Sequence, residues 1–293
     1  MLLRQTENLP DHPAIDAVGP DVAAKMMLDA QVAAVGAIAG ASDAITRAAQ
    51  VMADTITSGG TLIYAAAGSS GLMALADVCE LPGTFGIPTD QLRLHMAGGV
   101  PADGHMPGQT EDDTDQADAI AADITQNDCL IALSASGSTP FPVAIAEKAA
   151  ARGASVIGIA NNPDTPLLNI ADIAVCIHTP PEVLAGSTRL GAGTAQKVAL
   201  NMMSTLMGLH LGHVYQGRMV NLIADNAKLR ERAAGIVRTI ADVSDQKAQT
   251  ALETANGNVK VAILIASGLD PVQAQQALKV HKGHLGPCLA RND

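Results

Sequence analysis

Short runs of consecutive hydrophobic residues alternate, along the middle of the chain, with stretches whose hydrophobic residues recur every three or four positions. Runs of the first kind are typical of strands buried on both faces, and periodic stretches are typical of helices. The runs predict strands over residues 61–65, 92–97, 129–133, 155–160 and 173–177. The periodic stretches between them predict helices over residues 72–79, 114–124 and 141–151. Such alternation predicts an α/β fold, a three-layer αβα sandwich around a parallel sheet.

Both ends of the chain carry helical patterns without strands between them. Residues 14–58 predict two helices, and residues 193–211 predict a long helix that is hydrophobic almost all round, as in a protein core or a subunit interface. Charged residues at helical spacing follow over residues 221–239 and indicate a further helix, and then come three short helical patterns over residues 245–254, 259–266 and 271–280. We therefore expect a helical N-terminal segment (1–58), a central α/β domain (59–215) and a small helical C-terminal subdomain (216–293).

Composition and charge argue against nucleic acids and membranes as binding partners. The chain has 29 acidic and 18 basic residues, no Trp, two Tyr and two Phe. A negative field repels nucleic acid and anionic membranes, and few aromatic faces are present for base stacking. The sequence starts without a hydrophobic stretch of signal-peptide length and has no run of roughly 18 uninterrupted apolar residues. We expect a cytoplasmic protein without nucleic-acid or membrane partners, its four scattered cysteines being reduced thiols.

Two loops rich in Gly, Ser and Thr follow the first and the third predicted strands. Where a strand passes into a helix, backbone N–H groups point outward at the positive end of the helix dipole, and short hydroxyl groups add further donors. The donors in the two loops are Gly68, Ser69, Ser70, Ser134, Ser136, Ser138 and Thr139. One such loop is explained by turn and capping preferences alone, but two in one sheet favour binding of a phosphosugar.

Other ligand classes fit the sequence less well. Neither loop has the Gly-Lys-Ser/Thr of a P-loop or the spaced glycines of a dinucleotide-binding motif, so we expect no nucleotide. His210 and His213, like His281 and His284, have helical spacing but no third ligand nearby in the sequence, so we expect no metal cofactor.

Two glutamates after the first loop are candidates for acid–base chemistry. Glu80 lies at the end of a hydrophobic helix, just before Pro82, and a carboxyl group in such surroundings keeps its proton to higher pH, as a general acid requires. Glu111 begins a Glu-Asp-Asp run after the next strand. Each also has a structural explanation, because Glu80 fits a surface or capping position and acidic residues favour the start of a helix.

Several motifs together resemble the N-acetylmuramic acid 6-phosphate etherases, a family of the sugar isomerase (SIS) superfamily. The resemblance is strong over residues 55–232. It rests on Gly68-Ser-Ser-Gly71, Asp77-x-x-Glu80-x-Pro82-x-Thr84-Phe85-Gly86, Ala97-Gly98-Gly99, Glu111-Asp112, Ser134-Ala-Ser-Gly-x-Thr139-Pro140 and the block from Gly186 to Lys197. It implies that residues 59–215 form an SIS phosphosugar-binding domain.

The resemblance also implies a reaction and a set of roles. Family members cleave the D-lactyl ether of N-acetylmuramic acid 6-phosphate, giving N-acetylglucosamine 6-phosphate and D-lactate, without metal or nucleotide, in peptidoglycan recycling. By this resemblance Glu80 is the acid for the leaving oxygen and Glu111 the base. The loop hydroxyls hold an amino-sugar phosphate, and Lys197 supports the site or forms an ion pair at a dimer contact. We expect a cytoplasmic homodimer.

Three positions depart from the family pattern and keep other functions open. Leu72, Ser138 and Gly191 stand where the family usually has Arg, Arg and Lys. Loss of three cations suits a substrate with less negative charge. It also suits a sugar-phosphate sensor without catalytic activity, similar to the glucokinase regulatory proteins, whereas retention of both glutamates argues against one. An aldose–ketose phosphosugar isomerase would use the same fold and a similar proton transfer.

Overall fold

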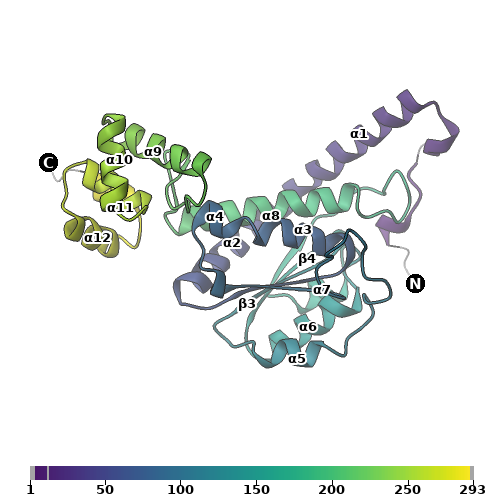
Figure 1. Cartoon of the computed structure of the whole chain (residues 1–293). Helices are drawn as coiled ribbons and strands as arrows, with labels where there is room; N and C mark the ends of the chain where they lie inside the picture. The colour runs from purple at the N-terminus through teal and green to yellow at the C-terminus, as the bar shows by residue number, and fades with distance from the viewer. Residues whose placement is uncertain (1–3, 12, 291–293) are drawn as a thin grey trace. The chain divides into compact units, whose positions relative to one another are not determined.

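The computed structural model describes residues 4–11 and 13–290 and divides the chain into two compact units (Figure 1). The first unit comprises Met1–Val78 and Asp90–Ser204, and the second comprises Cys79–Thr89 and Thr205–Asp293. The three-part division expected from the sequence stays a prediction.

A five-stranded parallel sheet forms the centre of the first unit, as predicted. Its strands lie in the order β2-β1-β3-β4-β5. Their bounds are β1 (Leu62–Ala66), β2 (Leu92–Met96), β3 (Cys129–Ser134), β4 (Ser155–Ala160) and β5 (Ile173–Cys176). Every residue of β1 and β3 is buried, which explains why these strands are continuous hydrophobic runs rather than alternating ones.

Helices cover both faces of this sheet, so the predicted three-layer αβα sandwich is confirmed. Figure 1 shows α5, α6 and α7 on one side of the strands and α2, α3 and α8 on the other. On the first side, Ile63, Leu130 and Ala132 pack against Phe141 and Ile145 of α6. The helices are α1 (Pro20–Gly36), α2 (Ser42–Thr57), α3 (Gly68–Val78), α5 (Ala117–Ala122), α6 (Pro140–Ala151), α7 (Pro166–Ile170) and α8 (Gly191–His210).

The two N-terminal helices differ in what they bury. α2 turns Ile45, Ala48 and Met52 toward the core, whereas Ala34 is the one buried residue of α1. A short 3₁₀ helix, Ala37–Ala41, separates them. By length and hydropathy the stretch Pro20–Thr57 is compatible with a membrane span, although the buried face of α2 is that of a core helix in a globular protein.

The second unit is mainly helical and has its own hydrophobic core, which includes Ile236, Ala251, Ile263 and Leu264. A two-stranded antiparallel ribbon, β6 (Val214–Tyr215) with β7 (Arg218–Met219), lies between α4 and the later helices in the sequence. The helices are α4 (Leu81–Phe85), α9 (Ala227–Ala241), α10 (Asp245–Thr254), α11 (Val259–Ala266), α12 (Pro271–Val280) and α13 (Leu285–Leu289).

Polar side chains fix the starts of four helices in this unit. Asn226, Ser244, Asn258 and Asp270 each accept a hydrogen bond from a backbone N–H group in the first turn of the following helix. Asp270 forms a capping box with Gln273, in which each side chain accepts from the other residue's backbone N–H group. Such caps satisfy N–H groups that would otherwise have no partner.

Candidate functional site

A polar pocket of about 500 Å³ lies in the first unit, where β1 and β3 end. β1 and β3 are neighbours, and the chain leaves them toward opposite edges of the sheet, so this is the switch point at which ligands of open α/β sheets bind. The pocket is lined by Arg4, Glu7, Ala67, Gly68, Ser69, Ser70, Glu111, Asp112, Ala135, Ser136, Ser138, Thr139, Pro140, Gly186 and Thr188.

The second serine loop is held in shape by its own hydroxyl groups. Ser134 is buried, and its Oγ lies 2.8 Å from Thr139 Oγ1 and accepts the Gly137 N–H at 3.0 Å. Ser136 Oγ accepts the Ser138 N–H at 3.3 Å. Ser136, Ser138 and Thr139 line the pocket, whereas Ser134 does not. The loop thus lies at the end of β3 and lines a pocket, while its role in phosphate binding stays a prediction, and Ser134 contacts the loop's own Thr139 hydroxyl and Gly137 N–H group.

Glu111 and the first loop meet in this pocket. A Cβ atom at Gly68 would lie 2.5 Å from Glu111 Oε1, so the carboxylate approaches the backbone where a side chain would stand. Gly68 also has a φ of +53°, which L-residues rarely adopt. The Phe141 N–H donates to the Glu111 carbonyl at 3.1 Å, which ties Glu111 to the first turn of α6. The carboxylate therefore lies beside the N-terminus of α3, which favours anions, and the Glu111 backbone lies beside that of α6.

An N-terminal segment, residues 4–7, completes the pocket and was missed by sequence reasoning. Thr6 is fully buried and is held by Asn162, whose Nδ2 donates to Thr6 Oγ1 at 3.1 Å. The Gly186 N–H donates to the Thr6 carbonyl at 2.9 Å. Arg4 and Glu7, on either side of this anchor, line the pocket. The one available signal was that Arg4 is the only Lys or Arg among residues 1–24.

Known proteins are similar in sequence to this chain over nearly its whole length. A model of the SIS domain family matches residues 29–161. The N-acetylmuramic acid 6-phosphate etherase of Deinococcus radiodurans is 37% identical over 99% of this chain and 96% of that protein. The chain belongs to the N-acetylmuramic acid 6-phosphate etherase family. The etherase of Streptomyces avermitilis is also 37% identical, over 96% of this chain and 91% of its own.

A further etherase, from Symbiobacterium thermophilum, is 41% identical over 75% of this chain and 74% of that protein. Among solved structures, a putative phosphosugar isomerase of Bacteroides fragilis involved in capsule formation superposes with a TM-score of 0.50. It covers 64% of this chain and 90% of its own, at 21% identity, and this likeness shows the fold alone.

Glu80, the other glutamate of the etherase signature, belongs to the second unit and not to the unit that contains the pocket. It is the residue preceding α4, in the second unit, and its side chain is exposed. The residues lining the 500 Å³ pocket all belong to the first unit, and Glu80 is not one of them. Its role as the acid therefore stays a prediction.

Lys197, another residue of the etherase block, contacts a buried carboxyl group instead of lining the pocket. Its Nζ lies 3.7 Å from Asp77 Oδ1 and donates to Asn201 Oδ1 at 2.7 Å. Tyr64 donates its hydroxyl to Asp77 Oδ2 at 3.0 Å, and Ser204 donates to Oδ1 at 3.1 Å. Burial raises the pKa of Asp77, and Lys197 opposes that rise. This network joins β1, α3 and α8, and the predicted role of Lys197 in substrate binding stays a prediction.

The three positions at which the chain lacks a family cation occupy different environments. Ser138 lines the pocket. Leu72 is exposed on α3, and neither it nor Gly191 lines the pocket. Gly191 is buried, and its N–H donates to the carboxylate of Glu182 at 2.9 Å at the start of α8. A Cβ atom there would lie 3.0 Å from Ala34 Cβ, so Gly191 allows a close packing of α8.

Metal-ligating residues do not gather in the part of the chain that the structure describes: no group of three His, Cys, Asp or Glu there could hold an ion. The expectation that the reaction needs no metal stays a prediction.

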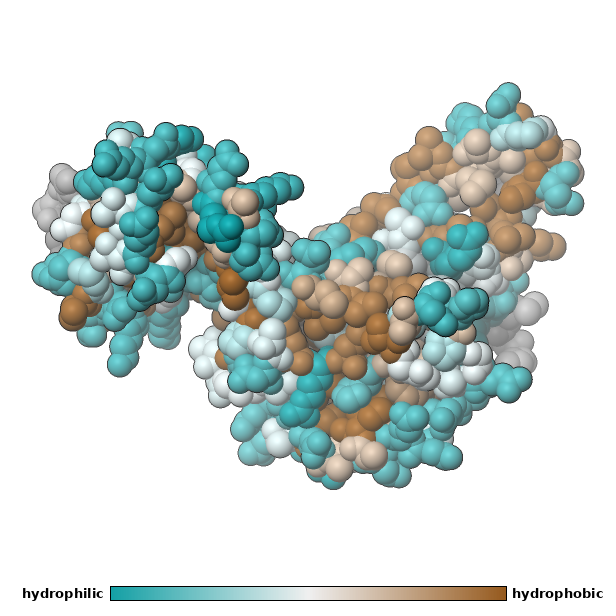
Figure 2. Space-filling model, viewed as in Figure 1, coloured by the Kyte–Doolittle hydropathy of each residue, from teal (hydrophilic) through white to brown (hydrophobic). Residues whose placement is uncertain are grey.

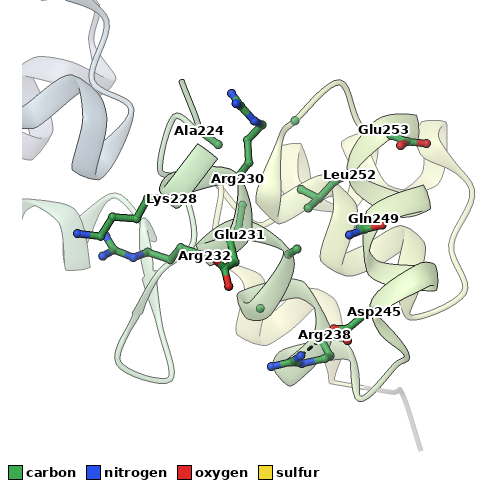
Figure 3. Close-up of a pocket in the computed structure, with 14 residues that line it drawn as sticks. Ala224, Lys228, Arg230, Glu231, Arg232, Arg238, Asp245, Gln249, Leu252 and Glu253 are labelled. Carbon is green, nitrogen blue, oxygen red and sulfur yellow. Dashed lines mark hydrogen bonds and ion pairs between the residues drawn. The ribbon is translucent and has the colours of Figure 1, made fainter. Parts of the chain in front are cut away.

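A second hollow, of about 1030 Å³, lies in the second unit between α9 and α10 (Figure 3). Its charged side chains do not converge: Arg230 points away from Lys228 and Arg232, and Glu253 lies on the far helix (Figure 3). Arg238 is paired with Asp245 at 2.7 Å. The charged side chains around this hollow thus point in more than one direction.

Proposed function

We propose that this protein cleaves the D-lactyl ether of N-acetylmuramic acid 6-phosphate and releases N-acetylglucosamine 6-phosphate and D-lactate. The observation that carries the proposal is the position of the Glu111 carboxylate against Gly68, in a pocket otherwise rich in hydroxyl and N–H donors. Membership of the etherase family supplies the substrate and the bond that is broken. The protein is a carbon–oxygen lyase, and we place it in the cytoplasm, in recycling of cell-wall sugars.

The phosphate group suits the two serine loops. α3 and α6 begin at these loops, and the N-terminus of a helix carries a partial positive charge. Ser69, Ser70, Ser136, Ser138 and Thr139 add hydroxyl donors around the same pocket. A phosphate monoester accepts several hydrogen bonds at once, so these donors bind it without a lysine in the loop.

The chemistry that follows is elimination and then hydration. Glu111 removes the proton from the carbon beside the open-chain aldehyde, and Glu80 protonates the lactyl oxygen as its bond to the sugar breaks. The lactate leaves, a carbon–carbon double bond forms in the sugar, and water adds across that bond. One carboxylate and one carboxylic acid provide both proton transfers.

Release of D-lactate from N-acetylmuramic acid 6-phosphate tests the proposal. Glu111→Gln and Glu80→Gln should each lower kcat/KM by about 10²- to 10⁴-fold, because removal of a general acid or base costs that much. Glu147→Gln, an exposed glutamate on α6 outside the pocket, is the matched control and should keep wild-type activity. Reaction in D₂O should place deuterium on carbon 2 of the sugar. A wild type that releases no lactate in a prolonged incubation would refute the function.

We further propose that α1 packs against a second copy of the chain. Val22, Leu28 and Val32 of this helix are 52%, 64% and 64% exposed, and Figure 2 shows hydrophobic residues gathered along it. Isolated helices of this length are marginal in water, so a helix that buries only Ala34 gains stability from a partner. The Lys25–Asp29 ion pair on α1 suits a protein partner better than lipid.

Oligomeric state tests this packing. Leu28→Glu combined with Val32→Glu should shift the protein from dimer to monomer in sedimentation velocity, because two charges would be buried without partners. Val272→Glu on α12 replaces a hydrophobic residue that is 75% exposed, more than Leu28 or Val32, and should leave the dimer intact. A wild type that sediments as a monomer at micromolar concentration would contradict the dimer.

A further inference from the structure

The N-terminal segment at the pocket is built into the first unit rather than resting on its surface. Besides the Asn162 and Gly186 contacts of Thr6, Gln5 Oε1 forms a hydrogen bond with His178 Nε2, and the Glu7 N–H donates to the Arg4 carbonyl at 2.9 Å. The Glu7 carboxylate lies where a Cβ atom of Gly186 would stand, 2.8 Å away, and Gly186 has a φ of +75°. Arg4 is therefore held at the pocket by its neighbours on the chain.

The pocket has more negative than positive side chains, although the substrate of the etherase family is itself negatively charged. Among the described residues that line it, Arg4 is the only cation, and Glu7, Glu111 and Asp112 are carboxylates. The substrate adds a phosphate and a lactyl carboxylate. The helix N-termini of α3 and α6 provide for the phosphate, but a carboxylate among three others needs a cation of its own.

Arg4 has the chemistry and the freedom to supply that cation. No ion pair involving Arg4 occurs within residues 4–11 and 13–290, so its guanidinium is available. A guanidinium presents two parallel N–H donors that match the two oxygens of a carboxylate. Ser138, which stands where the family usually has Arg, lines the same pocket as Arg4. A cation from another segment can therefore supply the positive charge that this position lacks.

We propose that Arg4 binds the lactyl carboxylate of the substrate, and so makes the N-terminal segment a determinant of specificity for the ether over other amino-sugar phosphates. The inference rests on the proposed function for the identity of the carboxylate. It assigns to residues 4–7 a direct part in substrate binding and gives the chain a replacement for a missing cation.

Two ligands separate the carboxylate from the phosphate. N-acetylmuramic acid 6-phosphate carries both groups, and N-acetylglucosamine 6-phosphate carries the phosphate alone. Arg4→Gln should raise KM for the first by about 10- to 100-fold, since charged hydrogen bonds contribute roughly that much and tenfold is about 1.4 kcal/mol. The Kd for the second, measured by calorimetry, should change by less than about twofold. Arg4→Lys should give an intermediate KM, because it keeps the charge and loses the paired donors.

Two further variants control for charge and for folding. Arg47→Gln removes one exposed cation on α2, outside the pocket, and should leave both ligands unaffected. Thr6→Val removes the hydroxyl that Asn162 contacts and should raise the same KM as Arg4→Gln, by releasing the segment. All variants carry a C-terminal tag, and the melting temperature of each is measured first. Kinetics are compared only among variants whose melting temperature matches that of the wild type, so that a misfolded protein is excluded.

Each outcome has a distinct meaning. An unchanged KM in Arg4→Gln overturns the inference and leaves the function intact. Equal weakening of both ligands also overturns it, because Arg4 would then bind the phosphate. If the wild type binds N-acetylmuramic acid 6-phosphate but releases no lactate, the function fails, and the role of Arg4 is still decided by the Kd of each variant for that ligand.

Discussion

The two hollows of this protein differ in size and in how their polar groups are arranged. The pocket of the first unit holds about 500 Å³ and is lined by residues that follow β1 and β3, whereas the hollow of the second unit holds about 1030 Å³ and lies between two helices. In the first, the loop hydroxyls share hydrogen bonds with one another and with backbone N–H groups. In the second, charged side chains of α9 point in different directions (Figure 3).

The difference shows that convergence of donors identifies the site better than volume does. Parallel strands deliver the ends of several chain segments to one edge of a sheet, and each following helix adds backbone N–H groups directed at that edge. A surface between two amphipathic helices exposes their polar faces, whose long side chains extend toward water. Changes in the pocket should therefore alter activity, whereas changes in the hollow should alter stability alone.

After the two glutamate substitutions, the next largest effect on activity should come from Gly68→Ala in the pocket. A Cβ atom there would clash with Glu111 Oε1, and the φ of +53° is unfavourable for alanine, so the loop and the carboxylate must both shift. We expect kcat/KM for lactate release to fall by about 100-fold, as a misplacement of about 1 Å in an active site costs. Wild-type kinetics for a folded Gly68→Ala would show that Glu111 and the loop are not in the working geometry.

The second unit should lose stability in acid, and His213 is the main reason. Burial lowers the pKa of His213 from 6.5 to about 3, Lys260 and His284 add to this, and a hydrogen bond to the Phe85 backbone opposes it. The unfolded state therefore binds more protons below pH 6.5, so the contribution is fully present above that pH and is lost as pH falls toward 3. The loss should reach about 2 kcal/mol at pH 5.

Urea unfolding at pH 7 and pH 5, followed by hydrogen exchange of α9–α12, measures this loss. His213→Gln cannot take up the proton and should show a smaller difference between the two pH values than the wild type. Equal differences in the two proteins would assign the acid sensitivity to other groups.

Helix bounds in the second unit show what local sequence determines. The predicted ranges 245–254, 259–266 and 271–280 coincide with α10, α11 and α12, because a capping side chain stands immediately before each start. The helix expected from residue 221 begins instead at Ala227, after the cap Asn226. Charge at helical spacing indicates that a helix exists, and only the capping residue marks where it begins.

The features of the site that could not be predicted from the sequence depend on contacts between residues far apart in the chain. The serine loops were predictable because each follows its own strand, and Glu111 was singled out by its place in the family motif. Arg4 reaches the same pocket through Thr6 and Asn162, which are 156 residues apart, and no local pattern encodes that pairing. The Lys197–Asp77 contact likewise depends on which face of α8 meets α3.

The smallest effect should come from Gly235→Ala, the counterpart of Gly68→Ala in the second hollow. Gly235 lies inside α9, and a Cβ atom there would meet nothing within 4 Å. Alanine in a helix interior is favoured over glycine because the unfolded chain loses less freedom, so the variant should be more stable by about 0.5–1 kcal/mol. Lactate release should stay at the wild-type rate. If it fell instead, the surface between α9 and α10 would have a part in catalysis, and the contrast between the two hollows would not hold.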